Sequence, residues 1–498
     1  MATQFAFITY DGEDKQTSTD RYQVRSHCMK GRNKREGSRR SKREARQAAK
    51  KVVRTNVDMS PVPILKGGLS SALNSAASRA ENAAISTKIP QRVKQKLESP
   101  RESPWARLPQ VPQGFLFGAA MDEFANAVGQ TPESLTRQFM TFNRITEASY
   151  PLVEVVVDFN DVGLGSIWSS FDKSFLHTIL FVNSAVNDWA QNLPLAKSSQ
   201  FHLGKTLTLL NKKLATGTSH QDDMTIYTVM LLAVVSSTSG DYNASNAHMA
   251  GLQRLVEMRN NHGYLWVNPV TQFKLECLDL MWCLIAGGAP LFLKTPVSWD
   301  PVFTRPSPSV DDELSVALSK ASMDRRLIVV FQELQRLTGL IEIHTDSNMR
   351  LNASEFQPVL SSIQTRLLHL KDLLVGMPDE WLCLGMLAFL ATMFRAPGRQ
   401  VAYEHLADRL RRACSSLVES TSMSTRSGLR PILRWLVIVC GATIFGTGER
   451  WIRELWDGIT EPKWLWPETR TELKRVMWIG CIHNQKGQQI FAALNLRR

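Results

Sequence analysis

Asp241–Leu265, DYNASNAHMAGLQRLVEMRNNHGYL, has the pattern of one amphipathic helix. Asp241 or Asn243 can begin this helix as an N-cap, because a short polar side chain accepts a hydrogen bond from the first free N–H groups. Residues 260–261, both Asn, and Gly263 tolerate the left-handed conformation that ends many helices. Apolar residues recur between these ends at helical spacing, with Arg254, Glu257 and Arg259 among them: Ala247, Ala250, Leu252, Leu255, Val256 and Met258.

The same helical patterning continues on both sides of this stretch, from residue 115 to residue 498. Thr131 is an N-cap signal, followed by Pro132 at the first helical position. Leu152–Phe159, LVEVVVDF, is the one β-branched run, and it fits either a strand or a helix. Helices are predicted over Thr131–Thr146, Phe171–Asn192, Phe201–Leu214, Asp222–Ser237, Asp241–Arg259, Pro269–Ile285, Val310–Ala321, Asp324–Leu340, Ser354–Val375, Asp379–Phe394, Arg399–Ser420, Pro431–Phe445, Glu449–Trp456 and Glu468–Cys481.

Composition divides the chain into three parts. Residues 1–54 form a basic N-terminal tail. Within it, Ser38–Arg54 contains good helix formers but almost no apolar face, so we expect this segment to be disordered alone and helical against a polyanion. Residues 55–114 are rich in Ser, Ala and Pro, which is typical of a linker. Residues 115–498 contain no second linker and are predicted to form one large all-α domain.

The positive charge is concentrated in the tail. The chain has a net charge of +13, and residues 1–114 contain 23 basic and 10 acidic residues, which account for all of it. Arg21–Arg54 alone holds 14 basic and 2 acidic residues. Such a block can neutralise phosphates and release counterions, or serve as a nuclear import signal. The candidate residues for DNA contact or nuclear import are Arg25, Lys30, Arg32, Lys34, Arg35, Arg39, Arg40, Lys42, Arg43, Arg46, Lys50 and Lys51.

Cysteine usage and hydropathy predict a reducing compartment and no membrane span. The seven cysteines are odd in number and none has CxxC spacing, so neither a disulfide framework nor a zinc cluster is expected. Most lie in apolar runs, where a free cysteine acts as a small buried hydrophobe. The longest apolar runs, Trp381–Phe394 and Trp435–Phe445, are shorter than the roughly 18–20 residues that a membrane span needs.

Motifs for catalysis or cofactor binding are incomplete. His202–Thr206, HLGKT, ends like a phosphate-binding loop, but Ser199 stands where the first glycine is needed, and a helix interior with an exposed lysine explains it better. Gly163-Leu-Gly165 and Gly446-Thr-Gly448 lack the third glycine of a dinucleotide site. His405 is interpreted as a surface histidine and His248 as a buried one. No catalytic residue, metal ligand or cofactor is therefore predicted.

Three segments resemble fungal-specific transcription factor domains. Asn246–Leu265 resembles their HL-x-GL-x-x-M-[VI]-x-x-RGG signature, with an expanded turn in place of the double glycine. Phe273–Phe292 is similar to the segment that follows in this family, with Asp279 and Pro290-Leu-Phe292 at matching positions. Phe5–Ile8 and Arg21–Met29 look like the F-x-F-(I/V)…R-x-x-(V/I)-R-S-H-x-M opening of a subgroup that has no cysteine cluster.

The resemblance implies a nuclear protein whose helical domain takes part in regulation, dimerisation or partner binding. The zinc cluster with which this family commonly reads DNA needs six cysteines, and this chain has only Cys28 before Cys277, so no zinc ligands can be assigned. The first hypothesis is therefore a transcriptional regulator that enters the nucleus and contacts DNA through Arg21–Arg54. The alternative is a co-regulator that does not bind DNA and acts through another transcription factor. A third hypothesis, an enzyme with a cofactor or ligand cavity in the helical body, has the weakest support.

Overall fold

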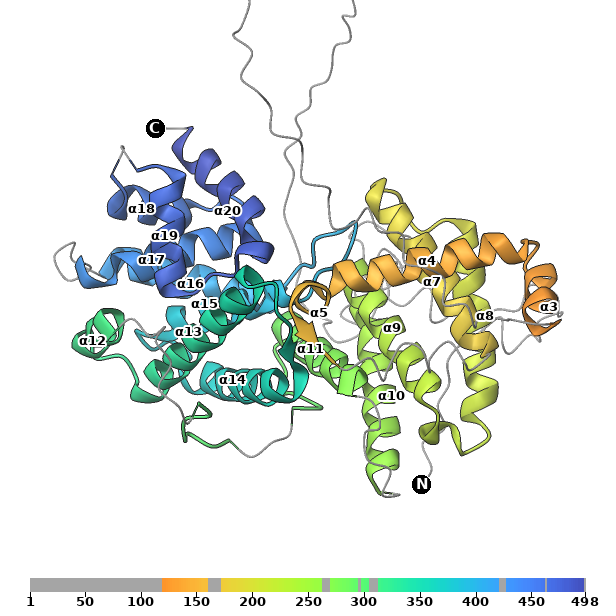
Figure 1. The fold of residues 1–498 in the computed structure, drawn as a ribbon. Coiled ribbons are helices and arrows are strands. Elements are labelled where there is room, and N and C mark those ends of the chain that lie inside the picture. The colour runs from red at the N-terminus through yellow and green to blue at the C-terminus, as the bar shows by residue number, and fades with distance from the viewer. Residues whose placement is uncertain are drawn as a thin grey trace, which may run out of the picture. The chain divides into compact units, whose positions relative to one another are not determined.

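A computed structural model describes residues 119–159, 172–261, 269–293, 297–303, 312–420, 427–461 and 464–496. Most of these residues lie in helices and almost none in strands, which confirms the predicted all-α fold (Figure 1). The predicted tail (residues 1–54) and linker (residues 55–114) lie outside the described residues.

The first half of the helical body, before residue 290, is an array of helices in which α7 packs on α8 and α9, and α9 packs on α10 and α11. Its elements are α3 (Ala119–Ala127), α4 (Pro132–Ser149), α5 (Pro151–Val155), β1 (Val157–Asp158), α7 (Lys173–Ala190), α8 (Lys197–Leu214), the short 3-10 helix η3 (Ser219–Gln221), α9 (Asp223–Ser239), α10 (Tyr242–Asn261) and α11 (Pro269–Ala286).

In the second half, α15 contacts α14, α16 and α17, and α17 contacts α18, α19 and α20. The elements are α12 (Asp312–Lys320), α13 (Arg325–Asp346), β2 (Leu351–Asn352), α14 (Ala353–Leu373), α15 (Glu380–Leu390), η4 (Ala391–Met393), α16 (Glu404–Ser420), η5 (Ser427–Leu429), α17 (Arg430–Cys440), the π-helical η6 (Gly441–Phe445), α18 (Arg450–Ile459), α19 (Trp466–Val476) and α20 (Gly480–Asn495).

Capping side chains explain where several helices begin. Thr131 accepts a hydrogen bond from the backbone N–H of Ser134 at 3.2 Å, and Pro132 is the first residue of α4, as predicted. Asp172 and Asp222 cap α7 and α9 in the same way. Each cap satisfies N–H groups that have no partner within the helix, so it fixes the helix start locally.

Helix α10 contains most of the stretch that resembles the transcription factor signature. It begins after Asp241, which accepts a hydrogen bond from Ala244 N at 3.1 Å, as predicted. The predicted apolar face is confirmed in part: Leu252, Leu255 and Val256 are buried, whereas Ala247 and Ala250 are exposed. The buried stripe, on the side that contacts α9, also includes Ser245, His248, Met249 and Arg259.

The ambiguous run Leu152–Phe159 is divided between a helix and a strand. Its first residues complete α5, and β1 then pairs in parallel with β2, with Val157 opposite Leu351. The backbone N–H of Leu351 also donates to the carbonyl of Val156 at 2.7 Å. The β-branched residues therefore form a two-residue pairing that joins segments far apart in the sequence.

Helix α15 lies at the centre of the second half, and all of its residues are buried. At its start, Glu380 accepts two hydrogen bonds from Arg409 of α16, at 2.6 and 2.8 Å, and one from the backbone N–H of Gly376 at 2.7 Å. This helix accounts for most of the apolar run Trp381–Phe394. Among the described residues, no helix is long and apolar enough to cross a membrane.

Several predicted boundaries move; α13, for example, ends at Asp346 and not at Leu340. The helix predicted over Asp379–Phe394 ends at Leu390 and tightens into 3-10 geometry. The helix predicted over Arg399–Ser420 begins only at Glu404. The helix predicted over Pro431–Phe445 ends in the π-helical η6. Irregular last turns of this kind satisfy backbone groups that lack an α-helical partner.

The C-terminal region corrects another prediction, because Glu468–Cys481 is not one helix. Helix α19 ends at Val476, the chain becomes extended at Met477, and α20 follows. The reason is the burial of Trp478, whose ring packs at centroid distances of 6.3 Å from Trp466 and 4.8 Å from His483. Packing against these rings outweighs the local tendency to continue the helix.

The contact between α20 and these tryptophans gives a stability prediction. A Cβ at Gly487 would lie 2.6 Å from the Trp478 ring and 3.1 Å from the Trp466 ring. Gly487→Ala should therefore lower the free energy of unfolding by about 1–3 kcal/mol through overpacking. Urea denaturation would measure this, and Gly448→Ala is the control because no atom lies within 4 Å of its added Cβ. An equal effect of the two changes would contradict the packing.

Candidate functional site

The twelve basic residues predicted to contact DNA or to direct nuclear import all lie outside the described residues. They are Arg25, Lys30, Arg32, Lys34, Arg35, Arg39, Arg40, Lys42, Arg43, Arg46, Lys50 and Lys51. Their role stays a prediction. Gly163 and Gly165 also lie outside the described part of the chain.

The His202–Thr206 segment lies inside α8 and not in a loop. Its backbone N–H groups belong to the helix and cannot surround a phosphate. His202 is buried, and its Nδ1 lies 3.0 Å from Nδ1 of His177, while Thr206 contacts Thr178. Burial, together with the charges of His202 and Lys205, lowers the pKa of His177 to about 4. The segment lies in a helix interior, as the sequence interpretation held.

Three further expectations concern single residues. Lys205 is half-buried rather than exposed, with its ammonium 5.8 Å from the Phe201 ring centroid. His405, expected at the surface, is also half-buried, because α11 ends against it at Gly287. His248 is buried, as predicted.

Within the described ranges, no group of three His, Cys, Asp or Glu side chains is placed to hold a metal ion.

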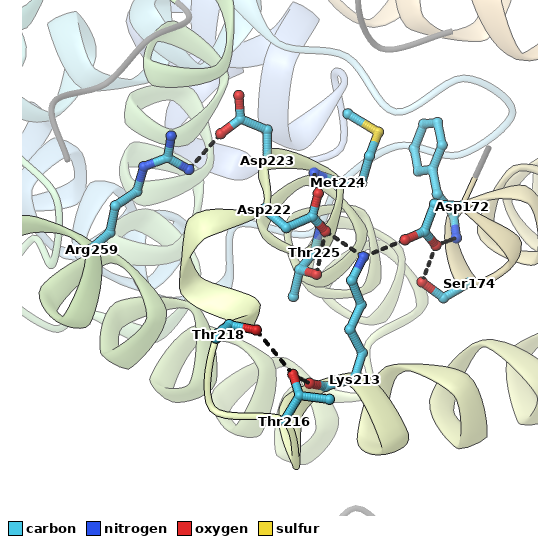
Figure 2. A network of polar contacts seen from close by, with 11 residues as sticks. Asp172, Ser174, Lys213, Thr216, Thr218, Asp222, Asp223, Met224, Thr225 and Arg259 are labelled. Atoms are coloured by element: carbon cyan, nitrogen blue, oxygen red, sulfur yellow. Dashed lines mark hydrogen bonds and ion pairs between the residues drawn. The ribbon is translucent and has the colours of Figure 1, made fainter. Parts of the chain in front are cut away.

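A polar network joins the starts of α7 and α9 to the end of α8 (Figure 2). Lys213, in the last turn of α8, donates to the N-cap residues Asp172 and Asp222. Asp223, at the first position of α9, accepts a hydrogen bond from Arg259 of α10. Both caps retain their hydrogen bonds to backbone N–H groups, so the one lysine is a counter-ion shared by two helix-capping carboxylates.

The charges in this network are mutually stabilising. Burial would lower the pKa of Lys213, but the hydrogen bonds and negative charges of Asp172 and Asp222 raise it overall. For Asp172, burial raises the pKa, yet hydrogen bonds from Lys213, Ser174 and the Phe175 N–H bring it below its ordinary value. A compensated cluster that fixes three helix ends is structural rather than catalytic.

A second carboxylate explains the spacing in the Phe273–Phe292 segment. Asp279, on α11, is fully buried, and its oxygens accept hydrogen bonds from the backbone N–H groups of Leu291, Phe292 and Leu293 at 2.7–2.9 Å. Three charge-assisted bonds hold the loop after α11 against the helix. The matching residues of the resemblance thus form one local structural unit.

A cavity of about 910 Å³ lies beside this unit, between α11 and α14. Its volume is that of a small-molecule site, and ten of its seventeen lining residues are polar. Phe159, Phe292, Leu293 and Val297 supply apolar surface, and Glu276 supplies a carboxylate. It is larger than the cavity of about 570 Å³ beside Arg395 and is the candidate functional site.

Glu276 is the chemically distinctive residue of this cavity. Its side chain accepts hydrogen bonds from Ser361 Oγ at 2.6 Å, from Gln272 Nε2 at 3.0 Å and from Gln357 Nε2 at 3.4 Å. Burial raises the pKa of Glu276 above its ordinary value, the charge of Asp279 adds to this, and the three hydrogen bonds offset it only in part. Glu276 is thus a buried acid supported by neutral donors.

The sequence reasoning missed this site. In the sequence, Glu276 is a single acidic residue within a mostly apolar predicted helix, and no motif marks it. Its partners Gln357 and Ser361 lie on α14, 81 and 85 residues later. The available signal was an acidic residue at a position that the helical period places in the core, since acidic residues are almost never fully buried without partners.

The network around Lys213 gives the first prediction of this subsection. Lys213→Met should lower the free energy of unfolding by about 1–3 kcal/mol, because Asp172 and Asp222 would lose their counter-ion while half-buried. Thermal denaturation at neutral pH would measure it. Lys212→Met removes an exposed lysine from the same turn and is the matched control. Equal melting temperatures for the two variants would refute a stabilising role for the network.

Glu276 gives a pH-dependent prediction. Because its pKa is raised on folding, its contribution to stability is present below the unfolded pKa, roughly 4.3, and is lost as pH rises through the folded pKa. Glu276→Gln removes this loss. The melting temperature of the variant, relative to the original chain, should therefore increase between pH 4 and pH 7. Glu355→Gln, an exposed acid on α14, is the control and should show no such increase.

Comparisons of the chain with protein-family models, with curated proteins and with solved structures found no match. Any functional assignment therefore depends on the chemistry of the residues themselves and on the resemblance in the three segments described above.

Proposed function

We propose that this chain is a nuclear transcriptional regulator of the fungal-specific type. The basic segment Arg21–Arg54 would direct nuclear import and contact DNA, and the helical body, residues 115–498, would serve regulation and the binding of protein partners or a second copy.

The observation that carries the proposal is the position of the charge. Arg21–Arg54 contains 14 basic and 2 acidic residues, whereas residues 115–498 contain 36 of each. Cations close together along a segment can displace the counterions condensed on DNA, which gives affinity without sequence information. A formally neutral body would add little to this attraction, so the two parts can have separate roles.

The internal pairing of charges in the body supports this division. Glu333 and Arg366 are both 1% exposed and form an ion pair, and Arg434 pairs with Glu472. Cations with buried partners of this kind are committed to the fold and are poor ligands for phosphate. The phosphate-binding capacity is therefore expected in the basic segment.

The cysteine pattern favours one alternative, a co-regulator that does not bind DNA itself. Only Cys28 precedes Cys277, so the N-terminal region cannot supply a cysteine-based zinc module for reading bases. In this alternative the basic segment would act in import alone, and the helical body would bind another transcription factor.

The proposal predicts different effects for two sets of charge removals. Changing Arg39, Arg40, Lys42 and Arg43 to Gln should reduce nuclear accumulation of a tagged full-length chain. It should also weaken DNA binding and flatten the slope of log K against log salt by up to about 3.6, since each neutralised phosphate contributes roughly 0.9. Live-cell imaging and DNA-binding titrations between 50 and 200 mM salt would measure these effects.

The control removes the same number of charges from the linker, at Arg92, Lys94, Lys96 and Arg101. Its effect should be clearly smaller. Unchanged import and an unchanged salt slope after the tail substitutions would refute the proposal. Loss of import with no DNA binding by either protein would support the co-regulator.

A further inference from the structure

We propose that the cavity between α11 and α14 binds an organic cation, a primary amine with a short apolar group, whose ammonium pairs with Glu276. This inference goes beyond the nuclear role and does not depend on it, because a chain that never meets DNA would still contain the cavity.

The first argument is the uncompensated charge of Glu276. Its side chain is 7% exposed, and its three hydrogen-bond donors, Ser361, Gln272 and Gln357, are all neutral. Among the described residues no Lys or Arg forms an ion pair with it. Buried charges in proteins are normally paired. A ligand cation would supply the missing counter-charge.

The neighbouring charged residues are already committed. Lys274, two residues earlier on α11, donates to the Tyr227 hydroxyl at 2.7 Å and lies over the Tyr227 ring. Arg366 lines the cavity but pairs with Glu333, so the two together add no net charge. Asp279 is held by backbone N–H groups. Glu276 therefore determines the sign of the ligand charge.

A second polar group in the wall is the backbone carbonyl of Ser354. Pro358 lies inside α14 and has no N–H to donate to the carbonyl of Ser354, one turn earlier. Both residues line the cavity. The Ser354 hydroxyl donates to Asn352, so this serine is also engaged at the helix start. This carbonyl belongs to an exposed residue, whereas Glu276 is buried, so the contact with the ammonium is assigned to Glu276.

Exposure decreases from the rim of the cavity to Glu276. Ser354, Pro358 and Pro269 are exposed, whereas Leu293 and Glu276 are buried. Apolar contact with Phe159 and Phe292 would then cover the hydrocarbon part of the ligand. A compact cation with one short apolar group could place its charge at Glu276 and its apolar group against the two phenylalanines. A strongly hydrated, wholly polar cation would leave this apolar surface without a partner.

Calorimetric titration of the full-length chain with 2-phenylethylammonium chloride tests the proposal at pH 7.5. The matched anion, 3-phenylpropanoate, has a similar apolar group and the opposite charge. We expect saturable binding of the amine and none of the anion. Glu276→Gln should weaken amine binding by at least about tenfold, as expected for loss of a charge-assisted contact.

Two further variants separate the ionic contact from general effects. Glu355→Gln removes an exposed carboxylate from α14 without touching the cavity, and its affinity should stay within about twofold. Ser354→Trp places a large ring at the exposed rim, leaves Glu276 in place and should reduce binding at least about tenfold. Circular dichroism and melting curves would verify that each variant is folded.

Several results would overturn the proposal: no saturable binding of the amine, tighter binding of the anion, or equal affinities in the folded Glu276→Gln variant and the original chain. An equal loss in the Glu355→Gln variant would also refute it, because the effect would then be one of overall charge. If Glu276→Gln does not fold, unchanged amine affinity in the Ser354→Trp variant would refute the proposal. Failure of DNA binding would leave these results unaffected.

Discussion

The contact between Glu380 and Arg409 lies at the start of a helix whose every residue is buried. Such a helix cannot hydrogen-bond to water, so each polar group at its ends needs a partner within the protein. Glu380 meets this need by accepting hydrogen bonds from Arg409 and from the Gly376 backbone, while Arg409 also donates to the Lys371 carbonyl. One carboxylate thus joins the end of α14 and the body of α16 to α15. The remainder of α15 is apolar, which requires α14, α16 and α17 to present apolar faces to it.

The same constraint explains how charges are distributed in the body. Arg434 donates to the Ile459 carbonyl, pairs with Glu472 and lies 3.9 Å from the Trp464 ring centroid. Lys213 is shared by two N-cap carboxylates. Both of these cations are paired with carboxylates. Glu276 differs from these two cations, because its three hydrogen-bond donors are neutral and it lines a cavity.

Local patterns in the sequence predicted most of the helical body, because helix periodicity and capping involve residues a few positions apart. Thr131 and Asp241 were recognisable as N-caps for this reason. The break at Trp478 was not predictable, since it depends on rings brought together by tertiary packing. Glu276 was missed for a related reason, as its character comes from residues on a distant helix. For the basic segment the sequence remains the sole guide, and its charge pattern indicates affinity for polyanions without identifying a target.

The parallel pairing of Val157 with Leu351 affects the order in which the chain can fold during synthesis. Leu351 follows Val157 by roughly 190 residues, so at about 5–20 residues per second the ribosome needs roughly 10–40 s to make the second strand after the first. Until then, the N–H and C=O groups of β1 have no β2 backbone to pair with. Closing a loop of this length also has an entropic cost that nearby helix pairs such as α7 and α8 avoid. The first array of helices can therefore assemble early, whereas the junction between the two halves has to wait until β2 has been made.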